Sequence, residues 1–261
     1  IAMGFGRDTA GTRITGLTVE TAATRLTGDA TLTNLGGNAN LDLALADISI
    51  VQPELRGPAT LNLSGSKTES EGITAIATFG LAEDRITLNA TQPAGDMTKL
   101  PITLDLTAGL RDLSRYSAIA GRRLAGQVDT TLSGSTTPDS GKVDFTVQAQ
   151  TRGLRTGSES LDKLVAGTAT LSAQVGRERF GALSIQNLRV TAPNLSLSGT
   201  LDASDGGGTA TYQARIADIR TFTPDFSGPL SATGNATRAN DGIWSVDSDI
   251  TGPGGANARA S

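Results

Sequence analysis

The chain has 261 residues, a net charge of −4 and only 3% aromatic residues, so any hydrophobic core must be largely aliphatic. It contains no cysteine and no histidine, which excludes disulfides, thiol or histidine-based catalysis, and zinc or haem sites built on those ligands. There is no basic stripe for a nucleic acid and no apolar run of the roughly 20 residues that a membrane-spanning helix needs. We expect neither an enzyme nor a bound cofactor.

Alternating apolar and polar residues predict β-strands along most of the chain. The pattern is clear at 41–45, 59–63, 86–90, 102–106 and 143–149. Such alternation places the apolar side chains on one face of a sheet and Asp, Asn, Thr or Gln on the other. The sequence therefore predicts an all-β chain whose mostly antiparallel sheet has one apolar face.

Two segments have helical rather than strand spacing, and turn residues separate the strands. Residues 112–120 carry apolar side chains three and four positions apart, and Gly121 can end such a helix. Residues 158–165 form a shorter candidate helix with Ser158 as its N-cap. The segments 138–141 and 205–208 are rich in Gly, Asp and Ser, which predicts hairpin loops.

A long internal repeat relates the two halves of the chain. Residues 46–48 recur as 217–219, which is 171 positions later, and 57–58 recur as 228–229 at the same offset. A constant offset of this length indicates a repeat architecture in which each unit stacks on the next.

The copies cover about residues 1–80 and 171–250. A shorter motif, in which a large apolar residue is followed two positions later by glycine, recurs at irregular spacing and predicts sharp strand entries or close backbone approaches. We expect a single continuous β-repeat segment over residues 1–261 that is truncated at both ends.

The order of these elements resembles a known family. Residues 110–135 (LRDLSRYSAIAGRRLAGQVDTTLSGS), 161–175 (LDKLVAGTATLSAQV) and 181–201 (GALSIQNLRVTAPNLSLSGTL) are similar to the β-repeat region of the TamB family of translocation and assembly module inner-membrane subunits. That family belongs to the AsmA-like superfamily of bridge-like lipid-transfer proteins of Gram-negative bacteria. The resemblance covers essentially the whole chain.

The resemblance implies an elongated β-taco, or half-pipe, with an apolar groove and one or two short helices. It also implies an inner-membrane-anchored protein that crosses the periplasm and pairs, through regions outside this chain, with an Omp85-type (TamA-like) outer-membrane barrel. Such proteins are implicated in moving phospholipids between the membranes and in outer-membrane protein assembly. The partners expected here are phospholipid acyl chains, with no nucleic acid and no transmembrane segment in this piece.

The apolar face needs a covering or an occupant, because soluble proteins rarely expose contiguous apolar patches above a few hundred Å². An ordinary β-sandwich core is one solution, and a trough filled by acyl chains is the other. In the second case the groove is expected to be lined by Leu17, Val19, Leu26, Leu41, Leu43, Leu45, Leu61, Leu63, Ile86, Leu88, Ile102, Leu104, Leu106, Val143, Phe145, Val147, Leu171, Leu188, Val190, Leu195, Leu197 and Leu201.

Two further functions stay open at this point. One is a structural or adhesive β-solenoid such as an autotransporter passenger, and the other is a chaperone-like scaffold that offers strand edges to unfolded proteins. Residues 122–123 are a pair of arginines that either are solvated or touch phospholipid headgroups. The adjacent carboxylates Glu83 and Asp84 are expected to be solvated in a turn.

Overall fold

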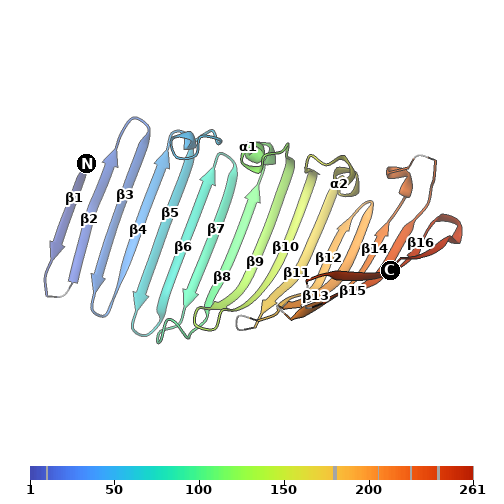
Figure 1. Cartoon of the computed structure of the whole chain (residues 1–261). Helices are drawn as coiled ribbons and strands as arrows, with labels where there is room; N and C mark the ends of the chain where they lie inside the picture. The colour runs from blue at the N-terminus through green and yellow to red at the C-terminus, as the bar shows by residue number, and fades with distance from the viewer. Residues whose placement is uncertain (10, 179–180, 205, 224, 240–241, 261) are drawn as a thin grey trace.

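The computed structural model describes residues 1–261 except 10, 179–180, 205, 224, 240–241 and 261. Seventeen strands form a single sheet (Figure 1), and each strand pairs antiparallel with its neighbours in sequence. The strands are β1 (Ala2–Arg7), β2 (Gly11–Glu20), β3 (Thr24–Thr33), β4 (Gly36–Leu45), β5 (Ala59–Thr68), β6 (Gly72–Leu81), β7 (Asp84–Gln92), β8 (Ile102–Leu110), β9 (Ala125–Thr137), β10 (Lys142–Arg155), β11 (Thr168–Arg177), β12 (Leu183–Ala192), β13 (Leu195–Ser204), β14 (Gly207–Ile216), β15 (Leu230–Arg238), β16 (Trp244–Thr251) and β17 (Asn257–Ala260).

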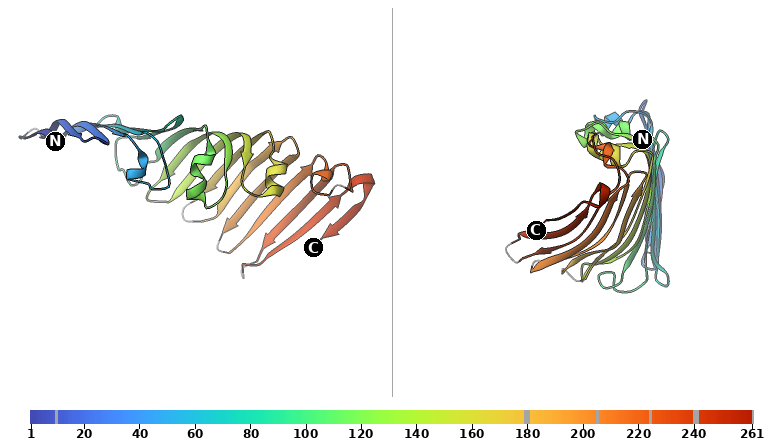
Figure 2. Two further views of the ribbon diagram at one scale, coloured as in Figure 1. Left: turned by 90° about the horizontal axis from the view of Figure 1, so that it is seen from above. Right: turned by 90° about the vertical axis from the view of Figure 1, so that its right-hand side faces the viewer.

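The sheet is open and curved rather than closed. Strands β1 and β17 lie at its opposite ends, and the twist of the sheet bends it into a half-pipe (Figure 2). Strand neighbours are about 4.8 Å apart, so sixteen spacings give a long axis of about 77 Å. The prediction of an all-β, mostly antiparallel half-pipe is confirmed.

The half-pipe is one layer thick. Its accessible surface is 15,730 Å², whereas a compact monomer of this mass is expected to expose about 10,700 Å². The excess arises because, among the described residues, no second sheet covers either face, and the side chains of most apolar strand residues are only partly buried. The β-sandwich alternative is therefore excluded.

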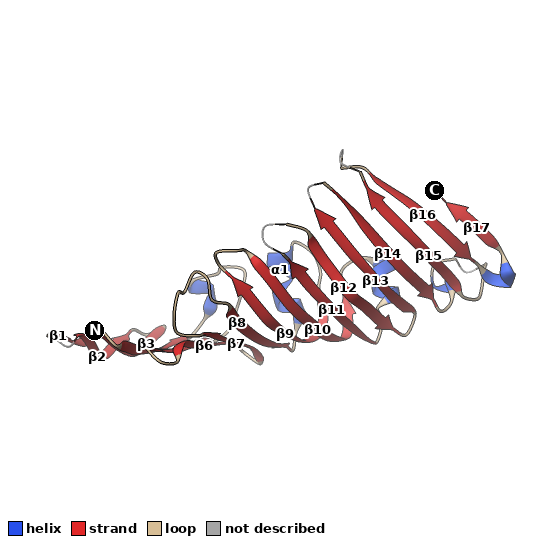
Figure 3. Ribbon diagram, turned by 90° about the horizontal axis from the view of Figure 1, so that it is seen from below, coloured by secondary structure: helices blue, strands red, loops and turns tan. Residues whose placement is uncertain are grey.

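Short helices occupy connections along one edge of the sheet (Figures 1 and 3). Three of them begin at an aspartate whose carboxylate accepts a hydrogen bond from the backbone N–H two residues on, which satisfies a free donor of the first turn. The elements are η1 (Ile48–Ile50), η2 (Leu113–Tyr116), α1 (Ser117–Ala120), α2 (Glu159–Leu164), η3 (Ile219–Thr221) and η4 (Pro253–Gly255).

Both predicted helices are present, with differences in detail. The predicted helix at 112–120 is divided into η2 and α1, and it ends at Gly121 in the left-handed conformation with φ 62°. The second helix is α2, and Ser158 is its N-cap residue as predicted, although the Ser158 side chain makes no capping hydrogen bond. Instead, the Asp162 carboxylate accepts hydrogen bonds from the backbone N and Oγ1 of Thr156, which fixes the turn that precedes the helix.

The sequence repeat corresponds to a repeat in the backbone. Strands β3 and β4 and helix η1 have the same lengths as β13, β14 and η3, at an offset of 171 residues. We call the segments 46–58 and 217–229, which carry η1 and η3, the caps of the first and second copies. Each cap closes with an equivalent hydrogen bond of 2.9 Å, from the N–H of Ile48 to the carbonyl of Gly57 and from the N–H of Ile219 to the carbonyl of Gly228. Both glycines have positive φ, at 106° and 115°, which permits the sharp strand entry that the motif predicted.

The predicted hairpin at 138–141 joins β9 to β10. In the second predicted hairpin, residue 205 lies outside the described residues, and the remaining positions lead into β14.

Candidate functional site: an apolar groove along the sheet

All of the predicted wall residues lie on one face of the sheet. Directly opposed residues of an antiparallel pair point to the same side, so the register can be followed from strand to strand. Leu26 opposes Leu43, for example, and Leu43 opposes Leu61. The alternation in each strand is thus kept in phase across the sheet, which the sequence of any one strand cannot guarantee.

One lateral row of side chains crosses sixteen strands and contains a single polar residue, Thr130. Following the pairs from β2 to β17, this central row is Val19, Leu26, Leu43, Leu61, Phe79, Ile86, Ala108, Thr130, Ala149, Leu171, Val190, Leu197, Ala214, Ala232, Ile250 and Ala258.

A second row, farther from the helical edge, contains no polar side chain. From β1 to β16 this distal row is Phe5, Ile14, Ala30, Ala39, Gly65, Ala75, Ala90, Leu104, Gly134, Phe145, Val175, Ile185, Leu201, Ala210, Ala236 and Val246. Because both rows run perpendicular to the strands, they follow the long axis of the half-pipe.

The helical edge covers the same face. Ile48 and Leu55, from the segment between β4 and β5, form a buried cluster with Leu45, Ala59 and Leu81 of the sheet. Leu81 is the largest fully buried side chain among the described residues. The segment between β4 and β5 therefore closes the upper part of the apolar face at this place and leaves the two rows below it as an open groove.

The groove is hollowed over β2 to β7. A hollow of about 550 Å³ lies there, and nearly all the side chains that line it are apolar or small, including Leu17, Leu41, Leu63 and Leu88. Leu63 in this hollow and Leu171 farther along the sheet are each 37% exposed. Large apolar side chains are thus held in strands but left open to an occupant.

A buried carboxylate, Asp84, anchors the segment 111–124 that carries η2 and α1, and here the prediction of a solvated side chain is wrong. Asp84 is 3% exposed; it accepts hydrogen bonds from the backbone N of Arg111 at 2.5 Å and from the Tyr116 hydroxyl at 2.8 Å. The Arg115 Nε lies 3.6 Å from the same carboxylate. Burial, together with the bond to Asp84, raises the pKa of Tyr116 well above its ordinary value.

The expectation of a solvated Asp84 failed because its partners come from a segment 27 or more residues away. The pair at 83–84 is turn-like in sequence, but only the docking of η2 buries its second member. No local signal in the sequence indicates this contact.

The C-terminal part of the groove has a different floor. Tyr212 of β14 lies over Gly234, where an added Cβ would come within 2.7 Å of the Tyr212 hydroxyl oxygen. That hydroxyl is hydrogen-bonded to the Ser248 Oγ at 2.5 Å. The Tyr212 ring, packed over Gly234, takes the place of the leucines of the N-terminal part. Its hydroxyl adds a hydrogen-bonded polar pair to a mostly apolar face.

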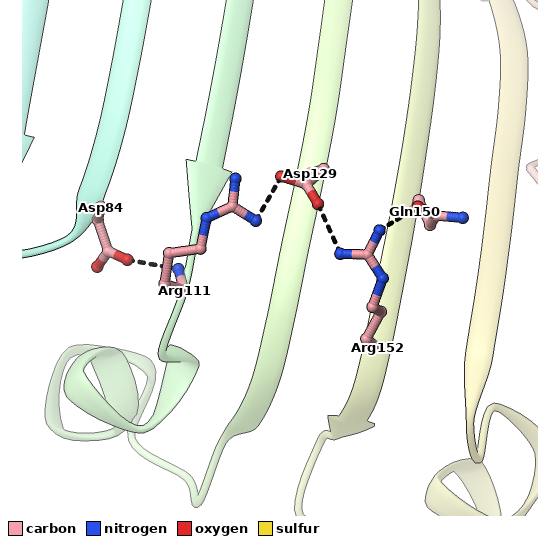
Figure 4. A network of polar contacts seen from close by, with 5 residues as sticks. All are labelled: Asp84, Arg111, Asp129, Gln150 and Arg152. Atoms are coloured by element: carbon pink, nitrogen blue, oxygen red, sulfur yellow. Dashed lines mark hydrogen bonds and ion pairs between the residues drawn. The ribbon is translucent and has the colours of Figure 1, made fainter.

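The opposite face of the sheet is polar. Asp129 lies between two guanidinium groups, 2.8 Å from Arg111 Nη1 and 3.2 Å from Arg152 Nη1, and Arg152 also donates to Gln150 (Figure 4). Two shallow hollows of about 570 and 720 Å³ on this face share Ser172 and Arg189 and are lined largely by polar side chains. This face offers no apolar row to an acyl chain.

The groove carries no arrangement of ligands for a metal ion. Among the described residues, no three His, Cys, Asp or Glu side chains come together in a way that could hold one. Within the same part of the chain, no helix combines the length and the apolar character that crossing a bilayer requires.

Comparison with known proteins adds no assignment to this geometry. No protein-family model, no curated protein and no solved structure matches the chain.

Proposed function

We propose that this chain is a periplasmic segment of an inner-membrane-anchored protein whose apolar groove carries phospholipid acyl chains between the inner and outer membranes. Participation in outer-membrane protein assembly with an Omp85-type barrel belongs to the same proposal, through its resemblance to the TamB family. The single observation that carries it is the pair of lateral rows, of which the distal row has no polar side chain and the central row has one, Thr130. They provide a continuous apolar path along the long axis, open on the side that faces away from the sheet.

The energetics favour an acyl chain as the occupant. Burial of each methylene contributes about 0.8 kcal/mol, so ten methylenes laid along a row would contribute about 8 kcal/mol before the costs of ordering the chain. Since neighbouring positions of a row are only one strand spacing apart, a chain can move along it without losing all contact at once. The rows contain few aromatic side chains and so provide little that would hold one chain shape at a fixed place.

Lipid retention by matched variants tests the proposal. Leu61→Arg places a charge in the central row and Leu104→Arg places one in the distal row, whereas Asn62→Arg and Thr103→Arg place the same charge on the opposite face. An unpaired charge in an apolar path costs several kcal/mol, by rough transfer estimates. We expect native mass spectrometry of the purified chain to show at least tenfold less bound phospholipid for the first two variants and no change for the controls.

Circular dichroism would establish that each variant is folded. Retention of lipid by folded Leu61→Arg and Leu104→Arg variants would overturn the proposal. A wild-type chain that holds no phospholipid would favour a scaffold or adhesive role, although a β-solenoid winds its chain into coils and this chain forms a single-layer meander.

A further inference from the structure

The connections along the helical edge differ sharply in charge. The segments 46–58, 156–167 and 217–229 each carry one more acidic than basic residue, giving a net charge of −1. The segment 111–124, which contains η2 and α1, has four arginines and one aspartate, a net charge of +3 on a protein whose total is −4. One place on the rim of the groove is therefore strongly cationic.

Two of these four arginines are already engaged. Arg115 lies against the buried carboxylate of Asp84, and Arg111 pairs with Asp129 on the polar face. Arg122 and Arg123 are exposed, and among the described residues neither side chain forms an ion pair within 4.0 Å. Their charge is available to a ligand.

A third arginine lies close to this pair along the backbone, on the next strand. Arg155 ends β10 directly opposite Ala125, two residues after Arg123. The backbone at Gly157 packs on the same segment, since a Cβ placed there would lie 3.1 Å from the carbonyl oxygen of Arg123. The Asp162 carboxylate already accepts two hydrogen bonds from Thr156, and these bonds, with a smaller contribution from the charge of Arg155, lower its pKa.

The cationic segment is fixed relative to the groove. Leu113 is buried, the Tyr116 hydroxyl is bonded to Asp84, and the Ser117 Oγ accepts the N–H of Leu124 at 3.0 Å. Ile119, in the same segment, is 52% exposed. A segment that carries both an exposed apolar side chain and two exposed arginines, at the helical edge of an apolar groove, is suited to an amphiphile with an anionic head.

We propose that Arg122, Arg123 and Arg155 form a binding site for the phosphate group of a phospholipid whose acyl chains lie in the groove. This inference rests on the proposed function. Guanidinium groups bind phosphate oxygens through paired N–H donors, so the site would select phosphate-bearing lipids over uncharged diacylglycerols. The segments 46–58, 156–167 and 217–229 each contain only one basic residue, so a phosphate site of this kind is expected at one place along the groove.

Calorimetric titration of the full chain with short-chain lipids tests the site. The probes are dihexanoyl phosphatidylglycerol, dihexanoylglycerol without the phosphate, and inorganic phosphate alone. We expect the Arg122→Gln/Arg123→Gln variant to bind the phosphatidylglycerol about twenty-five-fold more weakly, from about fivefold for each guanidinium, and to bind dihexanoylglycerol as the wild type does. Arg13→Gln/Arg25→Gln removes two exposed charges from β2 and β3 and is expected to change neither affinity by more than about twofold.

Three results would overturn the site. They are an equal loss for both lipids, an unchanged preference for phosphatidylglycerol in the variant, and binding of inorganic phosphate as tight as that of the lipid, which would indicate a free-anion site. If dihexanoylglycerol fails to bind the wild type, the proposed groove function itself fails. If it binds and the phosphate adds no affinity, only the rim site fails.

Discussion

The two copies of the repeat share a backbone but not a core. In the first copy the cap residue Leu55 is buried at 8% exposure, whereas its equivalent in the second copy, Phe226, is 63% exposed. The helices, their aspartate caps and the closing hydrogen bonds are the same in both. Local hydrogen bonding therefore forms the cap, and it does so whether or not the cap packs on the sheet.

The difference in packing originates two strands away from the cap. Leu81, at the end of β6, fills the space beneath the first cap and is fully buried. The equivalent position in the second copy is Gly252, which has no side chain to offer. Burial of a cap thus depends on a residue that is distant in sequence. Five experiments test this difference between the two parts of the chain.

The largest effect is expected from Asp84, whose equivalent in the second copy is Gly255. Asp84→Ala leaves the Arg115 guanidinium in a mostly buried place without its carboxylate, and breaking a pair of this kind costs about 3–5 kcal/mol. We expect hydrogen exchange of the amides in 111–124 to accelerate accordingly. A double variant, Asp84→Leu/Arg115→Met, should recover much of the loss, and a loss below about 1 kcal/mol in the single variant would contradict the anchoring role.

Truncating the equivalent cap residues should give unequal results. Leu55→Ala removes a buried side chain and is expected to cost about 2–4 kcal/mol of local stability. Phe226→Ala removes a larger but exposed side chain and should cost less than about 1 kcal/mol. Hydrogen exchange at the amides of Ile48 and Ile219 reads each cap separately, and equal losses would show that the second cap is also packed.

The glycines of the groove floor should differ in the same way. In Gly234→Ala the new Cβ would come within 2.4 Å of the Asp247 carbonyl oxygen and 2.7 Å of the Tyr212 hydroxyl, which predicts a loss of about 1–3 kcal/mol. At Gly65 the nearest atom to an added Cβ is 3.4 Å away, so Gly65→Ala should be nearly neutral. Urea denaturation of the two variants compares them, and a neutral Gly234→Ala would exclude a packed tyrosine.

The segment 111–124, which Asp84 anchors, should loosen in alkali. The pKa of Tyr116 is raised in the folded chain, so folding favours the neutral phenol. That stability is complete below the ordinary pKa of about 10 and is lost as the pH rises above it, at a rate of up to about 1 kcal/mol per pH unit for a partly exposed group. Hydrogen exchange of 111–124 above pH 10 measures the loss, and Tyr116→Phe should abolish the pH dependence.

The smallest effect is expected where the copies exchange glycine for asparagine. Gly16 has φ 59° and its equivalent, Asn187, has φ 53°, a conformation that asparagine adopts more readily than other side chains. Gly16→Asn should change the stability by less than about 0.5 kcal/mol. Gly16→Val should cost about 1–2 kcal/mol from backbone strain alone, since no atom lies within 4 Å of the added Cβ. Equal urea midpoints for the two variants would contradict this account.

Local patterns in the sequence were enough to predict the strands, their common apolar face and the repeat. Period-two alternation, as in 41–45 and 143–149, is a local property that follows from strand geometry, and the turn residues at 138–141 act within a few positions. The helix ending at Gly121 could also be predicted, because its apolar spacing and its terminal glycine are adjacent in the chain.

Which residues are buried, and how the rows align from strand to strand, could be known only from the tertiary structure. The register between strands places Leu104 beside Gly134 and Ala90, a relation that depends on loop lengths and bulges rather than on any strand's own pattern. Leu81 lies at a strand end and Asp84 in a turn-like pair of the sequence, but both are buried because segments distant in sequence dock on them. Burial is a property of contacts between distant parts of the chain, so the one-dimensional pattern could supply the groove's side chains but not the cap that covers its edge.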